Sequence, residues 1–225
     1  MSSCLATKGV KEVILVDNYD LEPATNLRDL DLERVTYIRP AQNLGSCHRF
    51  HLAAEMPPHR TLMCIDDDIL PSSDQIDALF THFESNPDRL HGLWGEDIQW
   101  RFGRVAFKTH VCEVNRPVDI LNRLYVFSPA QARRAIALAR QIGFEDWHRI
   151  GPGTDILMSF AGVQKPFCHS VGPIESCETA DAEGIAIWRR PGFYQQRMEI
   201  VRKLRALPKD PAQIQPADGL KRQLW

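Results

Sequence analysis

Three adjacent carboxylates, Asp66, Asp67 and Asp68, are the residues of this sequence whose types and spacing best suit chemistry. Carboxylates this close repel one another when all are ionised, so a bound cation stabilises them. Hard oxygen ligands suit Mn²⁺ or Mg²⁺, with water and substrate phosphates completing the coordination shell. The first and third carboxylates can point to the same side of an extended chain. We therefore expect Asp68 and Asp66 to bind the metal, with Asp66 also able to reach a ribose or a sugar.

The position of this acidic triplet strengthens the case for a metal. It follows an apolar run at 61–65, which predicts a buried strand, and precedes an amphipathic stretch at 72–84, which predicts a helix. Ligands of open α/β sheets bind at the carboxyl ends of strands, which favours a metal site here. The alternative is a solvated acidic turn, or favourable negative charge at the start of the following helix.

The elements before the triplet alternate in a regular way. Val13–Val16 and Val35–Ile38 predict buried strands, and residues 45–55 predict a helix that Pro57 and Pro58 end. Strands and helices alternating at this spacing predict an α/β fold with a mostly parallel, Rossmann-like sheet and helices on both faces.

The remainder of the chain continues as one domain over residues 1–207, followed by a loosely attached tail at 208–225. Residues 172–184 are rich in Gly, Pro, Ser and acidic side chains and predict a mobile loop. The patterns that predict further strands lie at 90–94, 104–108, 124–127 and 167–171, and those that predict helices lie at 129–143, 154–165 and 194–207.

The composition limits the class of protein. A formal charge of −2 and the lack of a Lys/Arg run argue against a nucleic-acid partner. No apolar run approaches the roughly 20 residues that span a bilayer, and no export signal is visible, so we expect a cytoplasmic protein. The six cysteines show no C-x-x-C spacing, which fits neither a zinc site nor a disulfide scaffold. Cys64 and Cys168 lie in strand-like runs and are expected to be buried thiols.

Four blocks of the sequence resemble exostosin-like glycosyltransferases (glycosyltransferase family sixty-four). SCHRF at 46–50 is similar to an N-x-R-F helix that precedes the family's acidic triplet. DQIDALFTHFESNPDRLHGLWG at 74–95 resembles the helix and strand that follow it. GTDILMSFAG at 153–162 and GIAIWRRPGFYQQRMEIVRKL at 184–204 resemble two later helices. The blocks occur in the family's order between about residue 10 and residue 205.

The resemblance implies a GT-A fold and transfer of a sugar from a UDP-sugar, with retention of configuration and assistance from Mn²⁺. The donor sugar would be an N-acetylhexosamine or a uronic acid, and the acceptor a glycan. Residue by residue, it matches Asp68 to the metal-binding aspartate, Asp66 and Asp67 to its acidic neighbours, Asp155 and Arg197 to catalytic-site residues, Arg190 to a second arginine of that segment, and Asn43 and Arg49 to nucleotide contacts.

The chemistry of these side chains agrees with the matched roles. An arginine stabilises the negative charge that develops on departing UDP, and a carboxylate such as Asp155 stabilises an oxocarbenium-like sugar. The alternatives are that Asp155 caps its helix and that Arg197 is a surface charge. Trp188 and Phe193 either stack on a sugar or belong to the core.

Three further polar residues have two interpretations each. His169 either approaches the metal or is a structural histidine. Glu96 and Asp97 follow a predicted strand, where they either contact the acceptor or are ordinary turn residues.

The sequence also departs from the family pattern. The family's first strand, which helps to hold the uridine, is not found before Val13, so we expect it to be missing or nucleotide binding to be rebuilt. Bulkier residues at 122–124 replace a small pair and are expected to change the choice of acceptor. Two other functions stay open: metal-dependent phosphoryl transfer or hydrolysis, and a non-catalytic domain that binds a glycan or a partner.

Overall fold

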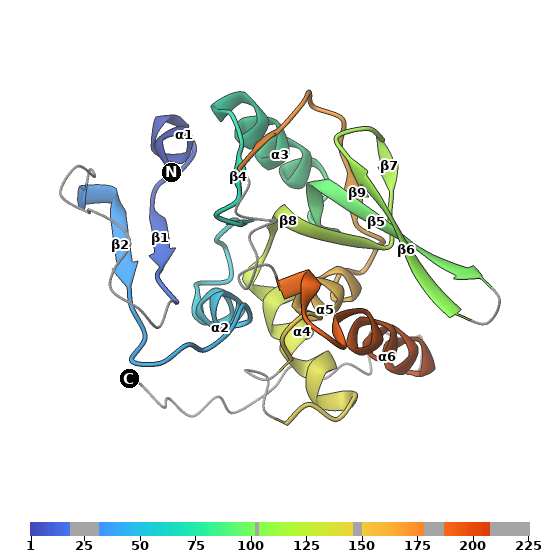
Figure 1. The fold of residues 1–225 in the computed structure, drawn as a ribbon. Coiled ribbons are helices and arrows are strands. Elements are labelled where there is room, and N and C mark those ends of the chain that lie inside the picture. Colours follow the sequence, from blue (N-terminus) through green and yellow to red (C-terminus); the bar gives the residue numbers. More distant parts are fainter. Residues whose placement is uncertain (19–31, 102–103, 146–149, 178–186, 208–225) are drawn as a thin grey trace.

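A six-stranded mixed sheet forms the centre of the molecule (Figure 1). The computed structural model describes residues 1–18, 32–101, 104–145, 150–177 and 187–207. Along the sheet the strands follow the order β3, β8, β5, β9 and β7, and β6 pairs with β5. Their bounds are β3 Leu62–Ile65, β5 His91–Arg101, β6 Arg104–Val111, β7 Arg116–Pro117, β8 Ile120–Phe127 and β9 Phe167–Cys168.

The prediction of a mostly parallel sheet is wrong. Within the central sheet only β5 and β9 pair in parallel, whereas the pairs β3–β8, β5–β8, β5–β6 and β7–β9 are antiparallel. The reason is that β5 turns back into β6 as a long hairpin, and apolar runs give no direction of pairing. The parallel arrangement is seen in a separate pair, β1 (Val13–Val16) with β2 (Val35–Ile38).

Helices cover both faces of the central sheet, as predicted. The larger core joins one face to α2, α4, α5 and α6, and the smaller core joins the other face to α3 through Leu79 and Phe83. The helix bounds are α1 Ser2–Ala6, α2 His48–Glu55, α3 Ser73–Ser85, α4 Pro129–Gln141, α5 Thr154–Phe160 and α6 Phe193–Ala206, with short 3-10 turns η2 Leu32–Arg34 and η5 Ile187–Arg189.

Two helices begin where their sequences predict. Ser72 starts α3 and Ser128 starts α4, and each forms a reciprocal capping box with a glutamine three residues later. These caps satisfy backbone N–H groups that the first turn leaves without partners. The predicted burial of Cys64 and Cys168 is also confirmed.

The segment after β9 returns to the acidic triplet, and its described part contains a short strand within the predicted loop. β10 (Glu175–Ser176) pairs with β4 (Ile69–Leu70), and the N–H of Cys177 donates to the Asp68 carbonyl over 2.9 Å. Figure 1 shows this segment passing α3 on its way to β4. Residues 178–184 of the predicted loop and the tail at 208–225 lie outside the described residues. No helix among the described residues is long and apolar enough to cross a membrane.

Candidate functional site

The acidic triplet lies directly after β3, and its outer two carboxylates are each paired with an arginine. Asp66 Oδ1 accepts from Arg49 Nη1 over 2.5 Å, and Asp68 Oδ2 lies 3.1 Å from Arg123 Nη1. The side chain of Asp67 is exposed. The side chain of Asp66 therefore points towards α2 and that of Asp68 towards β8, whereas the side chain of Asp67 points into the solvent.

An irregularity in β8 brings Arg123 to the triplet. The register between β5 and β8 shifts between Gly92 and Trp94, so β8 carries one extra residue there. Arg123 lies in this bulge with a φ of 58°, its carbonyl accepts from the Asp66 N–H over 2.8 Å, and its guanidinium lies 4.0 Å from the centre of the Trp94 ring. Strict alternation would turn neighbouring side chains to opposite faces, so the bulge allows Asn122 and Arg123 both to contact carboxylates.

A second charged group gathers around Arg197 from four different elements. Arg197 Nη1 donates to Asp155 Oδ2 over 2.6 Å and to the Pro152 carbonyl over 3.1 Å, while Nη2 donates to Glu96 Oε2 over 2.6 Å. The rings of Phe107 and Phe193 lie 4.9 Å and 5.4 Å from its guanidinium carbon. We call Glu96, Asn122, Asp155 and Arg197 the inner group.

The inner group is buried and holds more negative than positive charge. The side chain of Arg197 is 6% exposed and those of Glu96 and Asp155 are 14% and 16% exposed. Burial raises the pKa of Glu96, Arg197 opposes this shift, and Asp155 adds to it. Asn122 donates a side-chain hydrogen bond that favours the ionised form of Glu96. Arg197 is thus neither a surface charge nor free, and Asp155 is not the helix cap, because Gly153 occupies that position.

The acidic triplet and the inner group are connected through β8. Tyr125 of β8 is fully buried, and burial raises its pKa; Cys64 adds to the shift, Arg49 opposes it, and Asp155 and Asp66 each add a smaller raising effect. Consecutive residues of β8 also join the two groups, because Asn122 contacts Glu96 and Arg123 contacts Asp68. Side chains that are far apart in sequence thus gather in two charged groups that adjacent residues of β8 connect, and we call the two together the polar region.

The triplet offers a cation one unsatisfied ligand. Asp68 Oδ1 is buried without a hydrogen-bond partner, and burial raises the pKa of this carboxyl group against the opposing effect of Arg123. Asp66 is held by Arg49, and no group of three or more His, Cys, Asp or Glu side chains among the described residues is arranged to hold a metal. A cation at this place would take Asp68 Oδ1 from the protein and most of its other ligands from elsewhere.

The other predicted ligand-binding residues lie outside these contacts. Asn43 is exposed and accepts from the Gly45 N–H in its own loop. Arg190 is exposed just before α6, and Trp188 is 40% exposed beside Arg189. Phe193 is half-buried and packs against Arg197, so of the two predicted aromatics it is the one that contacts the inner group.

His169 belongs to a buried histidine cluster, as its structural interpretation predicts. His91 Nε2–H donates to the Asn86 carbonyl, so His91 Nδ1 accepts from His169 Nε2–H over 2.9 Å. His82 stacks on His169 with ring centres 3.9 Å apart. Burial lowers the pKa of His169 to about 3, with His82, His91 and Arg89 adding to the effect.

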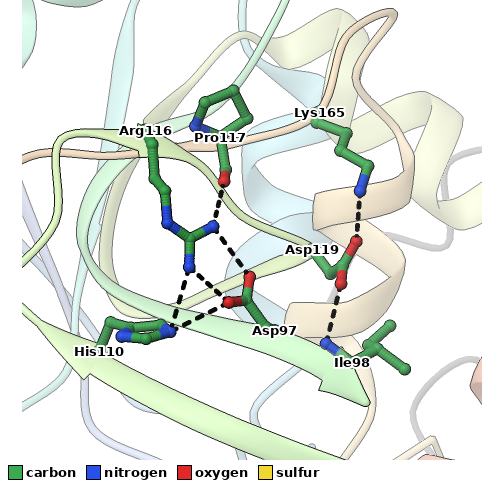
Figure 2. Close-up of polar contacts among 7 residues, drawn as sticks. All are labelled: Asp97, Ile98, His110, Arg116, Pro117, Asp119 and Lys165. Carbon is green, nitrogen blue, oxygen red and sulfur yellow. Dashed lines mark hydrogen bonds and ion pairs between the residues drawn. The ribbon is translucent and has the colours of Figure 1, made fainter. Parts of the chain in front are cut away.

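Asp97 points to the opposite face of β5 from Glu96. Figure 2 shows Asp97 between Arg116 and His110, with Arg116 Nη2 at 2.5 Å and His110 Nε2 at 3.0 Å from Asp97 Oδ2. Arg116 first and His110 second lower the pKa of Asp97 by hydrogen bonding. We call Asp97, His110 and Arg116 the outer group.

Two residues of the polar region, Asn122 and Arg123, were not predicted as site residues. The sequence marked them only as bulky replacements for a small pair. Their role depends on the β-bulge, which alternation of apolar residues does not reveal. A non-glycine residue with positive φ has no sequence signature of its own.

Comparisons with known proteins assign no family to the chain. No protein-family model matches it, and no curated protein matches it. Any functional conclusion must therefore rest on the arrangement of the side chains described above.

Proposed function

We propose that this chain is a glycosyltransferase of GT-A type that takes its sugar from a nucleotide diphosphate donor. The observation that carries the proposal is the contact between Asp155 and Arg197. The resemblance matches the two residues separately to catalytic positions, and they are 42 residues apart, yet they form a buried ion pair. A chance resemblance of scattered blocks gives no reason for such a contact.

The proposed chemistry replaces the bond between the anomeric carbon and the diphosphate oxygen with a bond to an acceptor hydroxyl. The acceptor proton passes to the departing diphosphate. Asp155 stabilises the positive charge that develops on the sugar, and Arg197 orients this carboxylate through their 2.6 Å ion pair. Because both terminal nitrogens of Arg197 are engaged by carboxylates, we propose that it positions Asp155 and is not a free fork for the diphosphate.

The proposal assigns a divalent cation, Mn²⁺ or Mg²⁺, to Asp68. The unsatisfied Asp68 Oδ1 supports this assignment, and Asp66 lies beside it. The cation would supply positive charge to the departing diphosphate. Arg49 forms an ion pair with Asp66 and Arg123 with Asp68, which reduces the repulsion within the triplet. They orient Asp66 and Asp68 without removing the free oxygen.

Calorimetric titration of the whole chain with UDP, with and without Mn²⁺, tests the proposal. We expect binding that requires Mn²⁺ and that Asp68→Asn weakens at least about tenfold, because a metal ligand loses its charge. The matched control is Asp74→Asn, an exposed aspartate on α3 that should leave binding unchanged. If UDP does not bind in the presence of Mn²⁺, the proposal is wrong.

One observation favours a second candidate, a non-catalytic domain that binds a glycan. Each outer carboxylate of the triplet is already neutralised by its own arginine, which reduces the need for a cation. This candidate predicts glycan binding that neither Mn²⁺ nor Asp68→Asn changes. The same titration therefore separates the two candidates.

A further inference from the structure

The proposed reaction favours a positive side chain beside the departing diphosphate, and Arg197 is not placed to act as one. When the bond between the anomeric carbon and the diphosphate oxygen breaks, the electron pair stays on that oxygen and adds negative charge there. Both terminal nitrogens of Arg197 are already held by carboxylates, those of Asp155 and Glu96. An arginine that binds the diphosphate must therefore be sought elsewhere in the polar region.

Arg123 has donors that a ligand can reach. Its Nη1 forms the ion pair with Asp68, whereas among the described residues its Nε and Nη2 have no hydrogen-bond partner and are open to solvent. The whole side chain is 22% exposed. Arg49, the other arginine of the triplet, differs because its Nε is buried without a partner. Arg123 is therefore the arginine that offers two neighbouring donors at the protein surface.

The guanidinium of Arg123 is held in place before any ligand binds. Its carbon lies 4.0 Å from the centre of the Trp94 ring, and Nη1 lies 3.1 Å from Asp68 Oδ2. An arginine stacks well on an aromatic face because its guanidinium is planar and delocalised. A side chain fixed in this way loses less rotamer freedom when it binds a ligand. These contacts leave the free donors of Arg123 beside the acidic triplet.

The backbone of Arg123 is also unusual. Its φ is 58°, in the left-handed region that glycine adopts freely and that a residue with a Cβ adopts at a cost in free energy. Such residues persist where their surroundings hold them, and they gather at binding and catalytic sites. The small residues of the resembled family at 122–124 would avoid this cost, so a function of the arginine explains why the chain carries one here.

Arg123 and the proposed cation would share one carboxylate. Arg123 is paired with Asp68 Oδ2, and the oxygen left without a partner is Oδ1. A diphosphate bound to a cation at Oδ1 is thereby brought near the guanidinium. Without a cation the three carboxylates of the triplet outnumber its two arginines and repel an anion. The cation and Arg123 therefore act together on the same group.

We propose that Arg123 binds the departing diphosphate and stabilises the negative charge that develops on it. This inference rests on the proposed function and deepens it, because it assigns to Arg123 the role that the sequence left to Arg197. Arg123 stays protonated and donates from Nε and Nη2. The electron pair of the broken bond remains on the diphosphate, which also receives the proton of the acceptor hydroxyl.

Calorimetric titration of the whole chain with UDP in the presence of Mn²⁺ tests this role. We expect Arg123→Met to weaken UDP binding at least about tenfold, because charge-assisted hydrogen bonds to the diphosphate are lost. The matched control is Arg116→Met, which removes an arginine that is likewise paired with an aspartate, Asp97, on the other face of the sheet. It should leave UDP binding unchanged.

A double-mutant cycle with Asp68→Asn distinguishes direct contact from an effect through Asp68. If Arg123 only positions the Asp68 carboxylate, adding Arg123→Met to Asp68→Asn should weaken UDP binding no further. Direct contact with the diphosphate predicts a further weakening of at least about threefold. The lack of any further weakening contradicts the proposal.

The outcomes separate this inference from the proposed function. Failure of UDP to bind the unaltered chain with Mn²⁺ overturns both. UDP binding that a folded Arg123→Met variant leaves unchanged overturns only the role of Arg123. Thermal unfolding establishes that the variant is folded. Should it not fold, Arg123→Gly takes its place, because glycine adopts a φ of 58° without strain. The same loss of UDP affinity is expected there, and unchanged affinity contradicts the proposal.

Discussion

Two neighbouring residues of β5 enter opposite charge arrangements on the two faces of the sheet. Glu96 belongs to the inner group, where two carboxylates share one arginine. Asp97 belongs to the outer group, where one carboxylate is shared by an arginine and a histidine (Figure 2). Alternation along the strand turns the two side chains to opposite faces. Adjacent residues of β5 therefore enter one group with more carboxylates than cationic side chains and another with more hydrogen-bond donors than carboxylates.

Burial decides what each arrangement means for the protein. The Arg197 side chain is 6% exposed and that of Arg116 is 45% exposed. Surface ion pairs contribute little to stability, whereas buried charges are costly and are tolerated only when they are well paired. An unbalanced buried group is therefore hard to explain by stability alone, which is why we assign function to the inner group and a structural role to the outer one.

Removing Arg197 should have the largest effect. Arg197→Met leaves Glu96 and Asp155 buried without their partner, so we expect the free energy of unfolding to fall by about 3–5 kcal/mol. Urea unfolding measures the change. The matched control is Lys203→Gln on the same helix, whose ion pair with Glu199 is largely exposed and should be worth about 0.5 kcal/mol or less. A loss below about 1 kcal/mol for Arg197→Met would contradict the picture of a tightly coupled buried group.

Moving α6 away from the start of α5 should disturb both the core around Ile200 and the inner group. A Cβ atom on Gly153 would lie 2.0 Å from Ile200 Cδ1, and Ile200 is fully buried on α6. We expect Gly153→Ala to destabilise the protein by about 1–3 kcal/mol because the core must repack, and to weaken Mn²⁺-dependent UDP binding. Gly9→Ala is the control, since its Cβ would meet only Asp77 Oδ1, at 3.8 Å. Equal effects of the two variants would show that α6 is not pressed against Gly153.

Local features of the fold could be predicted from the sequence because local chemistry determines them. The strands Val13–Val16 and Val35–Ile38 and the serine-capped helices follow from short apolar runs and capping residues. The direction of strand pairing could not, since β5 and β6 form a hairpin that apolar runs alone do not distinguish from two parallel strands. Long-range pairing depends on the whole sheet.

The candidate site shows the same limit. Asp155 and Arg197 were chosen by resemblance, and the structure brings them into contact. The contact of Glu96 with Arg197 was not predicted, since Glu96 was interpreted only as an acceptor contact or a turn residue. The sequence around a strand residue does not indicate its partner on a distant helix. Arg123 was missed because its contact depends on a bulge at a single position.

The pH dependence of stability should have opposite signs for the two neighbours. The pKa of Glu96 is raised by burial, so its contribution is fully present below the unfolded value of about 4.3 and is lost as the pH rises through the folded pKa. The pKa of Asp97 is lowered by Arg116, so its contribution is present above about 3.9 and is lost as the pH falls. The test is to measure the free energy of unfolding of the unaltered protein, Glu96→Gln and Asp97→Asn from pH 3 to pH 8. The difference between the unaltered protein and each variant, plotted against pH, should slope in opposite directions for the two variants. Parallel slopes would remove the distinction between the two faces.

The smallest effect is expected in the outer group. Arg116→Ala leaves Asp97 exposed enough to be hydrated and still hydrogen-bonded to His110, so the free energy of unfolding should fall by about 1 kcal/mol or less. Because this pair is screened by salt, the loss should shrink further at about 1 M NaCl, whereas the loss in Arg197→Met should persist. Urea unfolding of both variants at low and high salt makes the comparison. A salt-insensitive loss of several kcal/mol in Arg116→Ala would mean that the outer group is coupled as tightly as the inner one, and the assignment of function by burial would no longer hold.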